Sequence, residues 1–128
     1  MVFARWVFRI AGVYGLLAIL PMYFLEERIG RDQPPAITHP EFFYGFLGVT
    51  LAWQIAFLVI SADPVRLRPL MLPAIVEKAS FVIAVLLHYR GGRVAPATLV
   101  MGLIDMSLGI LFCAAFWRTA KRPGSGTG

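Results

Sequence analysis

The sequence predicts an all-α membrane protein, a four-transmembrane-helix antiparallel bundle. Four apolar stretches, at about 6–25, 42–62, 72–89 and 96–117, fill most of the 128 residues. A helix rises about 1.5 Å per residue, so roughly 20 apolar residues cross the hydrocarbon core of a bilayer. Charged residues make up only 15% of the chain, against about 25% in soluble domains. A soluble domain of this size could not cover its surface with so few polar groups.

The first stretch, 6–25, is less pure than the second and fourth because it contains Arg9. This arginine lies near one end, where a long side chain can reach the membrane surface. Pro21 cannot donate a backbone hydrogen bond to Leu17, so the last helical turn should be disturbed. No small-residue cleavage pattern follows, as a secretory signal would require, and we expect an uncleaved first span.

A polar connection, 26–39, precedes the second span and contains two adjacent prolines. It shows no apolar periodicity, which predicts an irregular loop that can fold over the mouth of the bundle. Thr38 and Glu41 have the spacing of a capping box, which marks the start of the next helix. The second span, 42–62, then runs for 21 residues without a charge.

The third span, 72–89, contains Glu77 and Lys78, and we expect Lys78 to reach toward the nearer membrane surface. A Gly-Gly turn separates this span from the fourth, 96–117, which makes the two spans antiparallel neighbours. The fourth span is 22 residues long and carries one charge, that of Asp105.

The spans together predict a single domain over residues 1–118. The final residues, 119–128, are rich in Gly and Ser, and they predict a disordered tail.

The basic residues lie beside the apolar stretches and do not form one polar face, so they indicate membrane anchors and no nucleic-acid partner. The lipid bilayer is the partner that this pattern predicts. Seven Lys and Arg residues lie on the side of the N-terminus and four on the other, which predicts a multi-pass protein with both termini cytoplasmic. The seven are Arg5, Arg9, Arg66, Arg68, Arg118, Lys121 and Arg122, and the four are Arg28, Arg31, Arg90 and Arg93.

Ionisable side chains inside a span are costly, at about 2.5–3.5 kcal/mol each near the bilayer centre, so each one needs a partner or a purpose. Asp105 lies near the middle of its span, on a stripe of small residues that should face protein. Antiparallel register places it level with Ala84. The same depth count brings Arg9 close to Glu77 as a candidate ion pair. The candidate intramembrane polar cluster is Gln54, Glu77, Ser80, His88 and Asp105.

Two interpretations of this cluster remain open. In the first, Asp105 is protonated or hydrogen-bonded to its neighbours and fixes the helix register. In the second, the cluster lines a pocket or a proton path. The residues form no recognisable catalytic motif or metal site, and the two histidines are too far apart in sequence for a zinc site, so we expect neither a metal nor a cofactor.

Two functional hypotheses follow. The leading one is a small non-enzymatic subunit or interaction partner, whose small-residue helix faces pack against another protein or a second copy of the chain. The alternative is a binder of a lipid, quinone or isoprenoid, or a membrane enzyme acting on one, that uses the Glu/Asp/His/Gln cluster. A packed core would favour the first hypothesis, and a cavity that holds a ligand would favour the second.

The string HPEFFYGFLGVTLAWQ at 39–54, with DPVRLRPLMLP at 63–73 and the following Glu77 and Lys78, resembles a group of small four-span bacterial membrane proteins. More distantly, the length and the small-residue helices are similar to DoxX-like membrane proteins, some of which are linked to respiratory quinol oxidation. The resemblance implies a bacterial inner (plasma) membrane location. It brings no site residues.

Overall fold

The computed structural model describes residues 2–120 and has no β-strand within them. Four segments of 23 residues are long and apolar enough to cross a membrane, which confirms the predicted all-α, four-span bundle. The chain is therefore an integral membrane protein that crosses the bilayer several times. The helices are α1 Val2–Ile19, η1 Leu20–Phe24, α2 Glu26–Asp32, α3 Pro40–Ala62, η2 Arg68–Leu70, α4 Met71–Arg90 and α5 Pro96–Arg118.

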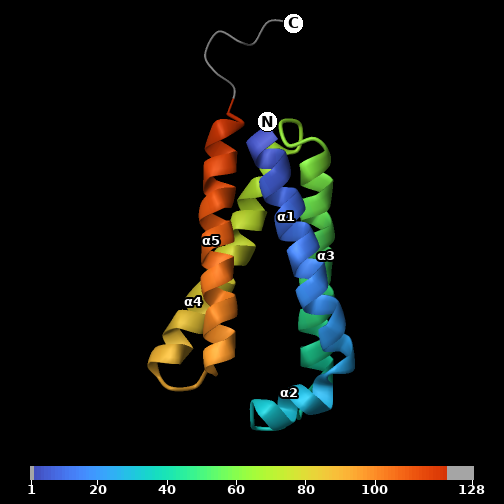
Figure 1. The fold of residues 1–128 in the computed structure, drawn as a ribbon, viewed down its shortest axis with the longest axis vertical. Helices are drawn as coiled ribbons and strands as arrows, with labels where there is room; N and C mark the ends of the chain where they lie inside the picture. The colour runs from blue at the N-terminus through green and yellow to red at the C-terminus, as the bar shows by residue number, and fades with distance from the viewer. Residues whose placement is uncertain (1, 121–128) are drawn as a thin grey trace, which may run out of the picture.

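The four long helices form two antiparallel pairs, α1 with α3 and α4 with α5 (Figure 1). Between the pairs, α1 packs on α5, whereas α3 and α4 touch only slightly. The pairs meet at the end that holds the N-terminus and the α3–α4 connection, here named the closed end. They diverge toward α2 and the α4–α5 turn, here named the open end (Figure 1).

Aromatic packing joins the two pairs at the closed end. The Phe8 and Phe112 rings stack with centroids 4.3 Å apart, and Phe57 meets Phe112 edge-on at 5.0 Å. Each such aromatic pair stabilises by about 0.5–1.5 kcal/mol beyond its buried area. The buried core around them consists of Ala4, Val7, Ala11, Ile60, Met71, Ala74 and Ala115. All four long helices contribute to this core.

Small residues let the helices of each pair approach closely. A Cβ on Gly15 would overlap the Gln54 carboxamide, and a Cβ on Gly102 would come within 2.8 Å of Val85. Close backbone approach of this kind is the usual role of glycine between membrane helices. Gly45 differs, since nothing lies within 4 Å of the position its Cβ would take. Gly15 and Gly102 thus serve packing within the chain.

The first span ends as its proline predicts, because α1 gives way at Leu20 to a short 3-10 helix with Pro21 in its first turn. The prediction of an irregular loop over 26–39 is wrong in part, since α2 occupies its first half. Acidic residues in its first turn and Arg31 in its last turn complement the helix dipole. These end charges, not apolar periodicity, favour the helix.

The predicted capping box is wrong: α3 begins at Pro40 with His39 as its N-cap, and no side chain caps it. Proline is favoured in the first helical position because its φ is already helical, which leaves Thr38 outside the helix. Glu41 instead contacts the His39 ring, with Oε1 3.3 Å from Nδ1.

Of the predicted disordered tail, 119–128, the structure describes only residues 119 and 120. The Thr119 hydroxyl donates to the carbonyl of Ala115 at 2.8 Å, and this side chain is buried. Residues 121–128 lie outside the described part of the chain.

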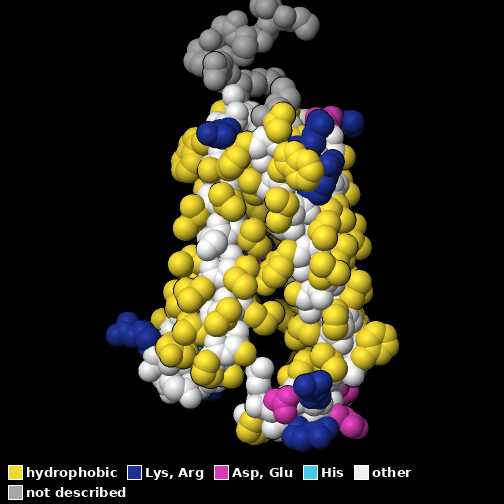
Figure 2. Space-filling view, in the orientation of Figure 1, with side chains coloured by type: hydrophobic (Ala, Val, Ile, Leu, Met, Phe, Trp, Pro, Cys, Tyr) yellow, Lys and Arg dark blue, Asp and Glu magenta, His cyan; other side chains and the backbone are white. Residues whose placement is uncertain are grey.

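Hydrophobic side chains cover the flanks of the bundle, and the charges visible on this face gather at its two ends (Figure 2). A surface of this kind matches a bilayer, whose core solvates apolar groups and whose two interfaces solvate charges.

Candidate functional site

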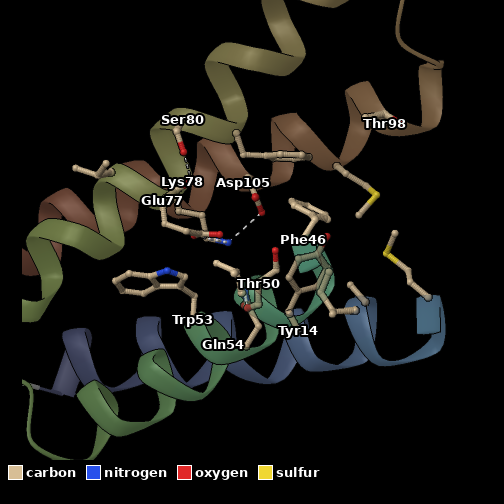
Figure 3. Close-up of a pocket in the computed structure, with 18 of the residues that line it drawn as sticks. Tyr14, Phe46, Thr50, Trp53, Gln54, Glu77, Lys78, Ser80, Thr98 and Asp105 are labelled. Carbon is tan, nitrogen blue, oxygen red and sulfur yellow. Dashed lines mark hydrogen bonds and ion pairs between the residues drawn. The ribbon is translucent and has the colours of Figure 1, made fainter. Parts of the chain in front are cut away.

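A cavity of about 550 Å³ lies between the two helix pairs. Side chains of α3 face those of α4 and α5 across it (Figure 3). Its walls combine aromatic and aliphatic side chains with a few polar ones. The lining includes Tyr14, Gly15, Ala18, Met22, Ile29, Gln33, Phe46, Thr50, Trp53, Gln54, Val76, Glu77, Lys78, Ser80, Phe81, Thr98, Met101 and Asp105.

A charged network of three residues, Glu77, Lys78 and Asp105, lies on the wall that α4 and α5 contribute to this cavity. The Lys78 ammonium lies 3.2 Å from Asp105 Oδ1 and 3.8 Å from Glu77 Oε2 (Figure 3). The side chains of Lys78, Glu77 and Asp105 are 3%, 17% and 16% exposed. The Phe57 ring covers the ammonium at 5.2 Å. The network therefore holds three ionisable groups away from both ends of the bundle.

Lys78 does not reach the membrane surface, and that prediction is wrong. The helical path of the third span begins at Arg68, through η2, and not at Leu72. The longer span places Lys78 near its middle, where the inward-facing Asp105 carboxylate is the nearest strong acceptor. Buried charges are tolerated in a membrane when they pair in this way.

The predicted ion pair between Arg9 and Glu77 does not form, because Glu77 pairs with Lys78. The Arg9 guanidinium lies over the Trp6 ring, 5.2 Å from its centroid, on an exposed part of α1. Arg9 belongs to the closed-end half of its helix, whereas Glu77 lies deeper in the bundle. Lys78, which lies on the same helix as Glu77 and is nearer to it, pairs with Glu77 in place of Arg9.

Of the predicted polar cluster, four residues line the cavity and one does not. Gln54, Glu77, Ser80 and Asp105 share it, whereas His88 lies in the exposed last turn of α4. Ser80 lies at the rim, and its hydroxyl donates to the Glu77 carbonyl at 3.0 Å.

The register of α4 against α5 differs slightly from the expected one, which placed Asp105 level with Ala84. Gly102 contacts Val85, and Gly109 approaches the Cβ of Lys78. This shift places Asp105 about two residues closer to Lys78, within reach of the lysine side chain. Ala84 is exposed.

Two buried side-chain oxygen atoms in the described chain have no hydrogen-bond partner, namely Gln54 Oε1 and Glu77 Oε2. The Gln54 side chain is 1% exposed, and its Nε2 donates to the Thr50 carbonyl at 2.9 Å. An unpaired buried polar group costs about 1–3 kcal/mol. Both atoms are acceptors on residues of the cavity wall, and Glu77 Oε2 lies 3.8 Å from the Lys78 ammonium, too far for a hydrogen bond.

Sequence reasoning missed Lys78 and Tyr14 as lining residues. The signal for Lys78 was present: a lysine beside a glutamate inside an apolar span, with one aspartate on the next span. A span that begins at Leu72 places this lysine near the membrane surface, whereas the span that begins at Arg68 places it near the middle. Tyr14 gave no such signal, since aromatic residues are common on every face of a membrane helix.

A side-chain hydrogen bond crosses the open end of the cavity. The Thr98 hydroxyl of α5 lies 3.3 Å from Gln33 Oε1, just after α2. On the other side, the Tyr44 hydroxyl donates to Glu26 Oε2 at 2.9 Å and ties α2 to α3. The short helix α2 is thus fixed to one helix pair and bonded to the other across the mouth.

Within residues 2–120, no three His, Cys, Asp or Glu side chains come together as a metal site would need. Comparison with known family models, curated proteins and solved structures finds no match. The chemistry of the site therefore follows from its own geometry: a pocket with apolar walls and one charged, hydrogen-bonding position.

Proposed function

We propose that this protein binds a small amphipathic molecule inside the membrane, in the cavity between its two helix pairs. The observation that carries the proposal is the charged network Glu77, Lys78 and Asp105 on the wall of a cavity of about 550 Å³. Ligand sites are concave, mostly apolar and furnished with a few polar groups that fix orientation. This volume lies within the usual range of about 300–1,000 Å³.

The cavity favours binding over the subunit role. Gly15 and Gly102 are occupied by packing within the chain, which removes part of the support for a docking face. A second candidate function keeps one observation in its favour. Gly45 and Ala52 are small residues on an exposed face of α3, so a partner helix or a second copy of the chain could approach this face closely.

The location proposed for this activity is a bacterial inner membrane, with both termini cytoplasmic. The N-terminus, the α3–α4 connection and the end of α5 lie together at the closed end (Figure 1). The charge count assigns these same three segments to one side of the membrane, which supports the proposed topology. In this orientation the open end, where α2 lies, faces the outer side of the membrane.

Extraction of the protein in native lipid nanodiscs, followed by mass spectrometry of bound small molecules, tests the proposal. Ala18→Phe fills the cavity and should abolish any enriched species. Ala52→Phe places the same ring on an exposed part of α3 outside the lining and should retain it. Equal recovery from both variants, or no enriched species from the unmodified protein, would contradict the proposal.

A further inference from the structure

The charges of the cavity indicate which kind of molecule it accepts. Among residues 2–120, Glu77, Lys78 and Asp105 are the only Lys, Arg, Asp or Glu residues in its lining. In their ionised forms, two carboxylates surround one ammonium, which leaves one negative charge in excess. Ion interactions in a low-dielectric site are strong, so this excess repels an anionic head group and attracts a cation.

The single cation of the site is already engaged. Lys78 contacts Asp105 at 3.2 Å and Glu77 at 3.8 Å, and its ammonium faces the Phe57 ring on a further side. A phosphate or carboxylate would have to compete with both carboxylates for this ammonium. Each of those carboxylates would also repel the incoming anion.

The hydrogen-bonding capacity left over points the same way. The buried side-chain oxygens of the described chain that lack a hydrogen-bond partner are both acceptors: Glu77 Oε2, 3.8 Å from the Lys78 ammonium, and Gln54 Oε1, which packs against Gly15. A ligand that supplies N–H or O–H donors can hydrogen-bond to the Glu77 carboxylate, and an acceptor-only ligand cannot. An ammonium group supplies both hydrogen-bond donors and a positive charge that offsets the excess negative charge.

The walls around this acidic position suit an apolar body. Trp53, Phe46 and Phe81 line the cavity, and the Phe46 and Phe81 rings stack across the gap between α3 and α4 with centroids 6.5 Å apart. Aromatic faces attract cations as well as apolar groups. A flexible or aryl hydrocarbon attached to an amine therefore matches both parts of the cavity.

We infer that the cavity selects amphipathic amines, with the ligand ammonium on the Glu77 carboxylate and its apolar part between α3 and α4. This inference rests on the proposed binding function. It names the charge and the hydrogen-bonding character of the ligand, which the volume of the cavity alone does not.

Three probes that share one apolar body test the inference: 4-phenylbutylamine, 4-phenylbutanol and 4-phenylbutyrate. The protein is placed in phosphatidylcholine nanodiscs at neutral pH, with Trp6 and Trp117 changed to Phe so that fluorescence reports on Trp53. Empty nanodiscs correct for partition into lipid. The amine should change the fluorescence saturably, with an affinity at least about tenfold above that of the carboxylate.

Glu77→Gln keeps the size of the side chain and removes its charge, and it should lower the amine affinity by about tenfold or more. Glu41→Gln is the matched control, since Glu41 is exposed and lies outside the cavity lining, and it should leave the affinity unchanged.

The outcomes separate the two proposals. Equal or tighter binding of the carboxylate or the alcohol would overturn the selectivity for amines and leave binding in the cavity intact. An unchanged amine affinity in Glu77→Gln would also overturn it. If none of the three probes binds saturably, both the selectivity and the proposed function fail.

Discussion

Replacing Lys78 by Met should be among the most damaging single changes in this protein, because it leaves two carboxylates in the bundle without their cation. At an effective dielectric constant of about 20, charges 3.2 Å and 3.8 Å apart attract by about 5 and 4 kcal/mol. Desolvation of the three groups and repulsion between Glu77 and Asp105 offset part of this attraction. Removal of one partner from a buried ion pair typically costs about 3–5 kcal/mol, and we expect a loss in that range.

Unfolding with increasing SDS in mixed micelles, followed by circular dichroism, measures this loss. Arg93→Met removes the same charge at an exposed position and should change the free energy of unfolding by less than about 0.5 kcal/mol. Asp105→Asn should cost about 1–2 kcal/mol in the unmodified protein, because Lys78 keeps Glu77 as a partner.

The same Asp105→Asn change should be neutral or stabilising once Lys78 is Met, because it then removes a carboxylate that has no cation. The effect of Asp105→Asn on the free energy of unfolding would then depend on whether Lys78 is present. Such a dependence identifies a coupled network and not two independent packing sites. Costs of the two changes that simply add, within about 0.5 kcal/mol, would refute the network.

Two further predictions concern packing and topology. Gly15→Ala should destabilise the bundle by about 1–3 kcal/mol, because the new Cβ overlaps the Gln54 carboxamide. Gly45→Ala places its Cβ in open space and should have little effect on stability. SDS unfolding measures the stability of both variants, and equal losses would contradict the contact between α1 and α3 at Gly15. In a background that lacks the native cysteine, Arg66→Cys should resist an impermeant thiol reagent in intact cells, and Arg93→Cys should react. The opposite labelling pattern would invert the proposed topology.

The fold could be predicted from the sequence because one physical constraint dominates it. A long apolar segment in a membrane must satisfy its backbone internally, and a helix is the way a single segment does so. The antiparallel order followed from short connections. The ends of the elements were less certain, since they depend on local competition. Pro40, for example, sets the start of α3 more strongly than Thr38 and Glu41 do, and η2 lengthens the third span toward Arg68.

The candidate site could be predicted only in part, because its members were chosen by helical periodicity. Periodicity places Glu77 and Ser80 on one face, and both line the cavity. It does not give the depth of a residue once the start of the span is misplaced by four residues, as happened for Lys78. The sequence pattern does not indicate the cavity, because the cavity forms where the two helix pairs diverge. Gly15 and Gly102 pack within these pairs and not between them.

The uneven packing of the two ends predicts where the molecule moves. The closed end holds the aromatic core, whereas α3 and α4 barely touch and the mouth is crossed by the hydrogen bond between Gln33 and Thr98. Regions with few buried contacts open at lower free energy, so the helix pairs should pivot about the closed end. Spin labels at the exposed positions Phe42 and Leu87, near the open end, should give a broad distance distribution.

The matched pair of labels at Val59 and Leu72 lies on the same two helices near the closed end, and it should give a narrow distribution. A ligand that bridges α3 and α4 should narrow the distance distribution between the labels at Phe42 and Leu87 and leave that between Val59 and Leu72 unchanged. Binding lowers the free energy only of those conformations in which the ligand contacts both helices. Double electron–electron resonance spectroscopy in nanodiscs measures both distance distributions. Equal widths at the two ends would show that the pairs are held together along their whole length, and the cavity would then have to admit its ligand without a movement of the helix pairs.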